Sequence, residues 1–214
     1  MYNLVVIPGS PALAEPLASH DAASRGLLRA ATELISEICS GSSLENGSEN
    51  SSGAERMPVD IVCSWDKRWY TSCEGSLRAW GAPSVEVGQG HHLPEIMARY
   101  VLAESAVGAQ VEQVRDTLAP LRDGVLTVVV VDGSAGLTQR APLAMIDSAQ
   151  EAHLWCEALL SGTAQGCDEE KLRAAGVLET SLWAQLAALN PVACELRAAD
   201  STLGVGRYVA GWQC

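Results

Sequence analysis

Histidine side chains, which supply many metal ligands and acid–base groups in enzymes, are scarce in this chain. The 214 residues contain four of them, namely His20, His91, His92 and His153. His91 and His92 are adjacent, and adjacent residues of a strand point to opposite faces, so the pair could bind one ion only from a loop. No Asp, Glu or Cys stands at a spacing diagnostic of a metal site with them. We therefore expect no metal site, and we place the pair at the start of a helix near Leu93.

Three short loops that follow predicted strands carry the other candidates for chemistry. The ligand-binding residues that we expect there are Gly9, Ser10, Trp65, Asp66, Asp132, Gly133 and Ser134. The carboxylates could bind a cation or a sugar-like hydroxyl, and a glycine lets a ligand approach the backbone closely. Ligands of open α/β sheets bind in the crevice at the carboxyl ends of the strands. The alternative is that these are ordinary turn residues, because Gly, Pro, Asp and Ser dominate turns.

Nucleophile motifs are incomplete. Ser134 lies in the segment Asp-Gly-Ser-Ala-Gly, in which Asp132 stands where the serine-hydrolase elbow has its first glycine. A hydrolase triad also needs a histidine, and His153 is the only one further along the chain, inside a predicted helix. The glycines before His91 lack the Lys and Ser or Thr of a phosphate-binding loop. The sequence predicts neither a serine hydrolase nor a nucleotide phosphate site.

Strands alternate with helices along the chain. The pattern predicts strands over 2–7, 59–63, 84–87, 125–131, 193–198 and 205–212, and helices over 21–39, 93–106, 110–118, 148–160, 168–174 and 179–189. Residues 125–131 are almost all β-branched, which is typical of a strand buried on both faces. This order predicts an α/β fold with three layers, α/β/α, around a mixed, largely parallel central sheet. His20 should flank the first helix, and His153 should be a partly exposed helix residue.

The whole chain, 1–214, is expected to form a single domain. The segment from about residue 40 to 57 differs from the rest because it consists mainly of Ser, Gly, Asn and Glu. Between 40 and 56, Leu44 is its one apolar residue larger than alanine. Such a composition is typical of flexible linkers, so we predict a flexible internal loop there.

An excess of acidic residues excludes several classes of partner. The chain has 26 Asp and Glu against 14 Lys and Arg, a net charge of −12. Nucleic acids and anionic membrane surfaces both attract clustered basic residues, so we expect neither as a partner. No segment resembles a signal peptide or a membrane span, and the seven cysteines are scattered without a CxxC pair. These features predict a cytoplasmic protein with reduced thiols.

Aromatic residues gather in one polar segment. Trp65, Trp69, Tyr70 and Trp80 lie close together in a chain that has no phenylalanine. Exposed together, they would form an interface, for instance in a homo-oligomer or a larger complex. The alternative is that they close the mouth of the crevice or complete the core.

Three segments together resemble a known family. They are VVIPGSPAL near the start, VVVVDGSAGLTQRAP in the middle and STLGVGRYVAGW near the end. In this order they resemble the class III extradiol ring-cleavage dioxygenases, subunit-B-like, and in particular a branch of small, alanine-rich actinobacterial proteins. The resemblance covers nearly the whole chain and implies the same three-layer fold.

The resemblance also implies a cofactor that this sequence does not match. The family's activity implies a non-haem Fe(II) held by two histidines and a glutamate, with a further histidine for acid–base work. Gly9 stands where the first ligand is expected, no histidine lies near Trp65, and Ala135 follows Ser134 where the acid–base histidine is expected. Glu179 is the candidate for the carboxylate ligand. The resemblance therefore implies the fold without the chemistry and without bound iron.

Two functional hypotheses remain open from the sequence. The first is a dioxygenase-like protein that has lost Fe(II)-dependent ring cleavage and binds a small molecule or a protein partner in the crevice. The second is an enzyme of another class, hydrolytic or metal-assisted, that uses Asp66, Asp132 or Ser134 of the same crevice. A carboxyl group with a strongly raised pKa facing the crevice would favour the second.

Overall fold

A six-stranded sheet forms the centre of the protein. The computed structural model describes residues 2–45 and 56–214. The strands, in the order in which they lie in the sheet, are β5 (Ala109–Arg115), β2 (Met57–Val62), β6 (Leu126–Val130), β1 (Leu4–Ile7), β8 (Arg207–Gln213) and β7 (Ala193–Asp200). The first four run parallel, and β8 pairs antiparallel with both β1 and β7. The mixed, largely parallel sheet predicted from the sequence is confirmed.

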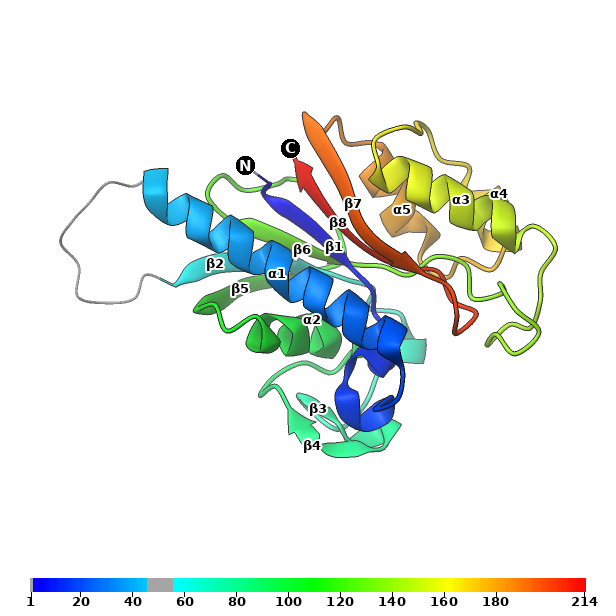
Figure 1. Ribbon diagram of the computed structural model, residues 1–214, viewed down its shortest axis with the longest axis horizontal. Coiled ribbons are helices and arrows are strands. Elements are labelled where there is room, and N and C mark those ends of the chain that lie inside the picture. Colours follow the sequence, from blue (N-terminus) through cyan, green and yellow to red (C-terminus); the bar gives the residue numbers. More distant parts are fainter. Residues whose placement is uncertain (1, 46–55) are drawn as a thin grey trace.

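Helices cover both faces of this sheet (Figure 1). One face carries α1 (Ala22–Glu45) and α2 (Leu93–Glu104), and the other carries α3 (Ala149–Leu160), α4 (Glu169–Ala174) and α5 (Thr180–Ala187). Side chains of β1 alternate between the two cores, with Val5 and Ile7 facing α1 and α2 and Leu4 and Val6 facing the opposite helices. The three α/β/α layers agree with the prediction, and burial on both faces explains why the central strands are apolar throughout.

The chain leaves two neighbouring strands toward opposite faces of the sheet. After β1 it passes to α1 on one face, and after β6 it passes to α3, α4 and α5 on the other. β1 and β6 are adjacent and parallel, with Ile7 opposite Val130. Their carboxyl ends therefore form a topological switch point, the place where open α/β sheets bind ligands.

The helix predicted over 110–118 is wrong, because this segment begins with the edge strand β5. Val111 pairs with Val59 and Gln113 pairs with Asp60, so Glu112 is an extra residue that bulges from the strand. The bulge places Val111 and Val114 against the same core despite their spacing of three. With Leu118 following at four, the apolar residues mimic helical periodicity.

The strand predicted at 84–87 lies outside the central sheet. It corresponds to β4 (Ala82–Glu86), which pairs with the short β3 (Ser76–Leu77) in a separate two-stranded sheet near the end of α2 (Figure 1). Short 3₁₀ helices complete this part of the fold: η1 (Pro11–Leu13), η2 (Glu15–Leu17), η3 (Lys67–Trp69) and η4 (Arg78–Trp80). Of these, η3 follows β2 and carries an important side chain of the site.

Helix α1 extends to Glu45, into the segment where the sequence predicts a flexible loop from about residue 40 to 57. The middle of that segment, residues 46–55, lies outside the described residues, and β2 begins at Met57. Among the helices that the structure describes, none is both long enough and apolar enough to cross a bilayer.

Two buried ion-pair networks tie elements of the sheet together. Asp60 on β2 is fully buried and accepts a hydrogen bond from Nε of Arg122 at 2.9 Å. Arg207 on β8 is also fully buried and pairs with Asp200 on β7 and with the hydroxyl of Ser24 on α1. A buried guanidinium is tolerated only with such partners, so Arg207 fixes the start of α1 against the β7–β8 hairpin.

Candidate functional site

The switch point brings together Gly9 and Asp132, which the sequence places 123 residues apart. Gly9 follows β1 and Asp132 follows β6, so both lie just beyond the carboxyl ends of adjacent strands. The backbone N–H of Gly9 donates to Oδ1 of Asp132 at 3.2 Å. A Cβ added at Gly9 would lie 3.3 Å from Oδ2 of Asp132, so glycine lets the two loops approach closely. The expectation that these loops share one crevice is correct for these two residues.

A second carboxyl group, that of Glu179, lines the same crevice. Glu179 lies at the N-cap of α5 and is only 9% exposed. A small cavity is bounded by Gly9, Trp69, Leu93, Pro94, Val130, Val131, Asp132 and Glu179. Its walls come from η3, from the start of α2, from the end of β6 and from the N-cap of α5. Two acidic groups thus face one another across a largely apolar space.

Trp69 forms part of the wall of this cavity. Its indole Nε1–H donates to Oε1 of Glu179 at 2.9 Å, which holds the ring beside this carboxyl group. The remaining volume is about 10 Å³, room for about one water molecule. Trp80 also packs against the core, whereas Trp65 and Tyr70 are 49% and 58% exposed. The aromatic residues therefore do not form one exposed patch, and Trp69 and Trp80 pack against the core, which was one part of the alternative interpretation.

The environment raises the pKa of both carboxyl groups. Loss of water around Asp132 raises its pKa to about 7, and the charge of Glu179 raises it further, against the Gly9 hydrogen bond and the more distant Arg207. Asp132 keeps a small accessible surface, but its carboxyl group lies deep within the protein. Burial also raises the pKa of Glu179, and the Trp69 hydrogen bond and Arg68 oppose this rise. Near neutral pH Asp132 can both donate and accept a proton.

Gly133 and Ser134 are turned toward the interior of the fold. A Cβ at Gly133 would lie 2.5 Å from the hydroxyl of Tyr208, so glycine makes room for this buried ring. The hydroxyl of Ser134 is completely buried, donates to the backbone oxygen of Ala175 at 2.5 Å and accepts from the N–H of Gly136. Neither residue lines the cavity. Both hold the loop after β6 in place and so position Asp132.

Ser10, Trp65 and Asp66 lie outside the cavity. The backbone oxygen of Ser10 accepts from the N–H of Leu13 at the start of η1, and its hydroxyl makes no capping hydrogen bond. Asp66 is exposed, caps η3 by accepting from the N–H of Arg68 and pairs with that guanidinium at 2.9 Å. These bonds to Arg68 lower the pKa of Asp66. Asp66 therefore differs from Asp132 both in position and in protonation.

None of the four histidines is among the residues that line this cavity, and their positions agree with the expectations except in one case. His92 is the N-cap residue of α2, and Nδ1 of His91 lies 3.1 Å from the backbone oxygen of Thr71. His20 is exposed just before α1. The expectation of a partly exposed His153 is wrong, because this side chain is buried and lies 2.6 Å from the hydroxyl of Tyr208. Tyr208, far along the chain, provides the polar partner that burial of the imidazole requires.

The side chains at the crevice do not fit the Fe(II) site that the family resemblance implies. That site needs two imidazoles and a carboxylate, and the crevice offers two carboxyl groups and no imidazole. Within residues 2–45 and 56–214, no group of three or more His, Cys, Asp or Glu side chains is arranged to hold a metal ion.

Comparison with known proteins adds no relative: no protein-family model and no curated protein sequence matches this chain. The candidate site is therefore characterised by its own residues and their contacts alone. Trp69 and Glu179 are the residues of the candidate site that sequence reasoning did not bring together. They are separated by 110 residues, and no motif marks either one as a partner of Asp132.

Proposed function

We propose that this chain is a protein resembling the extradiol dioxygenases that has lost Fe(II)-dependent ring cleavage and binds a small molecule at the carboxyl ends of β1 and β6. The observation that carries the proposal is the pair formed by Asp132 and Glu179 in a small, largely apolar cavity. Two carboxyl groups whose pKa values are raised by burial have a structural cost, and such groups cluster at functional sites. The narrowness of the cavity favours a small molecule over a protein partner.

The chemistry of the walls favours an organic amine as the ligand. The residues that line the cavity include two acids and no Lys, Arg or His. An ammonium group donates three hydrogen bonds, and two carboxylates in a lining without a basic residue supply acceptors and opposite charge for it. An anion would meet like charge in the same place.

Entry of such a ligand requires Trp69 to move. The cavity of about 10 Å³ is too small for an organic molecule, and the indole of Trp69 forms part of its wall and is bonded to Glu179. Outward rotation of Trp69 breaks one hydrogen bond to Glu179 and leaves space that fits a single aromatic ring. Benzylammonium, which joins such a ring to an ammonium group, is a suitable probe.

The test is a titration with benzylammonium that follows tryptophan fluorescence, with benzoate as a matched probe of opposite charge. We expect benzylammonium to bind with a dissociation constant on the order of 1 mM, as a fragment of this size does, and benzoate not to bind. The fluorescence change should be absent in Trp69→Phe, and the double variant Asp132→Asn, Glu179→Gln should bind at least about tenfold more weakly. Asp66→Asn, which changes an exposed carboxylate outside the cavity, is the control and should bind normally. Equal binding of benzoate would contradict the proposal.

Loss of iron chemistry needs its own measurement. Anaerobic titration with Fe(II), followed by metal analysis of the desalted protein, should leave well below one iron per chain, and the protein should not cleave catechol in air. Stoichiometric iron bound by the native chain would overturn this half of the proposal, because the crevice would then hold a metal without imidazole ligands.

A second candidate function is supported by the pKa of Asp132. A group with a pKa of about 7 is suited to general acid–base catalysis at neutral pH. In that case Asp132 would transfer the proton and Glu179 would hold the substrate. Ser134 does not take part, because its hydroxyl is bonded inside the fold. Conversion of an amine substrate that is abolished in Asp132→Asn, with binding retained, would favour this enzyme over a binding protein.

A further inference from the structure

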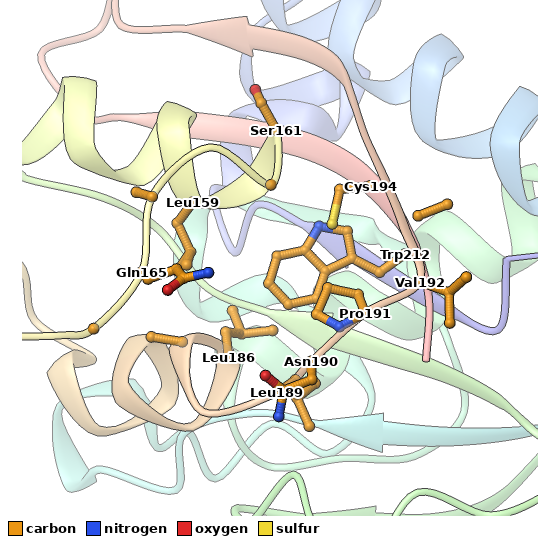
Figure 2. A pocket seen from close by; sticks show the side chains of 15 residues that line it. Leu159, Ser161, Gln165, Leu186, Leu189, Asn190, Pro191, Val192, Cys194 and Trp212 are labelled. Carbon is orange, nitrogen blue, oxygen red and sulfur yellow. The ribbon is translucent and has the colours of Figure 1, made fainter.

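A second, larger cavity lies at the other end of the strands from the acidic crevice. Its volume is about 460 Å³, within the range of small-molecule sites. It lies between the ends of α3 and α5, the loops that follow them, and the β7–β8 hairpin (Figure 2). Trp212 in its wall pairs with Leu4 at the start of β1, whereas Asp132 follows the end of β6. The two cavities therefore lie at opposite ends of the strands.

A fixed apolar wall forms the inner side of this cavity. Leu159, Leu186 and Trp212 line it and are at most 4% exposed. The indole Nε1–H of Trp212 donates to the backbone oxygen of Leu160 at 3.0 Å, which fixes the ring between α3 and β8. Figure 2 shows this indole in the midst of the lining side chains, close to Cys194 and Pro191. The wall is preformed, so a ligand would not have to order it.

Two carboxamides supply the polar contacts. Gln165, in the loop after α3, and Asn190, after α5, belong to the lining from different loops and are both labelled in Figure 2. In the described part of the chain, neither side chain makes a hydrogen bond, so their donors and acceptors remain available. Each carboxamide can donate and accept at the same time, and so complements a ligand group that does the same.

The electrostatics of the cavity select against charged ligands. None of its 15 lining residues is Asp, Glu, Lys, Arg or His, in a chain with a net charge of −12. Both α3 and α5 end at this cavity, and the carboxyl end of a helix carries partial negative charge. An anion would meet like charge there, and a cation would be attracted only by the partial charges of the helix ends and would find no carboxylate to replace its lost water. A neutral ligand avoids both of these electrostatic costs.

We propose that this cavity binds a neutral small molecule that carries a carboxamide-like donor and acceptor on an aromatic or apolar body. The ring would lie against the apolar wall at Trp212, and the polar group would bond with Gln165 and Asn190. This site is separate from the acidic crevice, and the two are expected to select ligands of different charge. The proposal does not depend on the function proposed for the crevice.

Three probes of nearly the same shape test this selectivity: benzamide, which is neutral, benzoate and benzylammonium. The reporter is Cys194, a free, partly buried thiol in the cavity wall, whose reaction with monobromobimane is followed by peptide mass spectrometry. Cys73, another partly buried free thiol, lies outside this lining and is the internal control. At about 10 mM, a concentration suited to fragment binding, we expect benzamide to slow labelling of Cys194 at least threefold and to leave Cys73 unchanged. Benzoate and benzylammonium should have no effect on Cys194.

Two variants test which side chains of the cavity contact benzamide. Gln165→Leu with Asn190→Leu keeps the approximate size of both side chains and removes their hydrogen bonds, so benzamide should no longer protect Cys194. Ser161→Ala is the matched control, because Ser161 belongs to the same lining but its hydroxyl is bonded to the backbone oxygen of Glu157 and points away from Trp212 in Figure 2. All three substitutions replace exposed residues, so the fold should be retained. The proposal is overturned if benzamide does not protect Cys194, if either charged probe protects it equally, or if the Leu variant keeps full protection.

Discussion

The raised pKa of Asp132 has a consequence for stability that the substitution Asp132→Asn can measure. In the unfolded chain this carboxyl group ionises near its ordinary value of 3.8, and in the folded protein it ionises near 7. Between these values the unfolded state loses its proton first, so the free energy of unfolding falls as the pH rises. The loss begins above about pH 3.8, is complete above about pH 7 and amounts to at most about 4 kcal/mol.

Asparagine removes this penalty and keeps an oxygen that can accept the hydrogen bond from Gly9. Between about pH 5 and about pH 8, the free energy of unfolding of the native protein should fall by about 2.5 kcal/mol more than that of Asp132→Asn. The assay is urea unfolding of both proteins at several pH values, followed by circular dichroism. A difference of this size lies well above the error of the extrapolation for a domain of moderate stability.

The control is Asp66→Asn. Asp66 is exposed, and Arg68 lowers its pKa, so this substitution should not reproduce the gain of stability at high pH. Stability curves of the native protein and Asp132→Asn that run parallel from about pH 5 to about pH 8 would refute the reasoning. They would mean that Asp132 titrates alike in the folded and unfolded states.

Three further predictions concern the framework of the site. Arg207→Met should lower the free energy of unfolding by about 3–5 kcal/mol in urea, because it leaves Asp200 without its buried partner. Gly133→Ala should lower it by about 1–3 kcal/mol, since the new methyl group would meet the hydroxyl of Tyr208, and a smaller loss in the Tyr208→Phe background would confirm that contact through a double-mutant cycle. Trp69→Phe should increase exchange of water with the crevice, and Asp132 in this variant should titrate closer to its ordinary value by NMR, because better hydration lowers the cost of its charge.

The elements of the fold could be predicted wherever burial acts on a continuous segment. The β-branched run of β6 indicates a central strand because both of its faces are buried, and α3 shows a regular helical spacing because one face packs on the sheet. Strand β5 could not be recognised, since the bulge at Glu112 changes the spacing of its apolar residues from two to three. The sequence indicates a strand at β4. Its pairing with β3 depends on contacts with other segments, which the local pattern of apolar residues does not indicate.

Part of the candidate site could be predicted from the order of elements. Gly9 and Asp132 each follow a strand of the predicted parallel sheet. The carboxyl ends of parallel strands meet at one edge of the sheet. Asp66 lies exposed in an ion pair with Arg68, which no motif indicates, and the role of Gly133 depends on Tyr208, a residue of a distant strand. Sequence reasoning therefore located the edge of the sheet that carries the site and left open which side chains face the cavity.

The most direct test of the acidic crevice is the number of protons released when benzylammonium binds. An ammonium group placed beside Asp132 stabilises the charged carboxylate, so a protonated Asp132 must give up its proton on binding. Calorimetric titrations in two buffers of different ionisation enthalpy yield this number. We predict a release close to one proton at about pH 6 and a release below about 0.2 at about pH 8, with neither seen in Asp132→Asn. Binding without proton release at the lower pH, or an equal release in Asp132→Asn, would contradict the account.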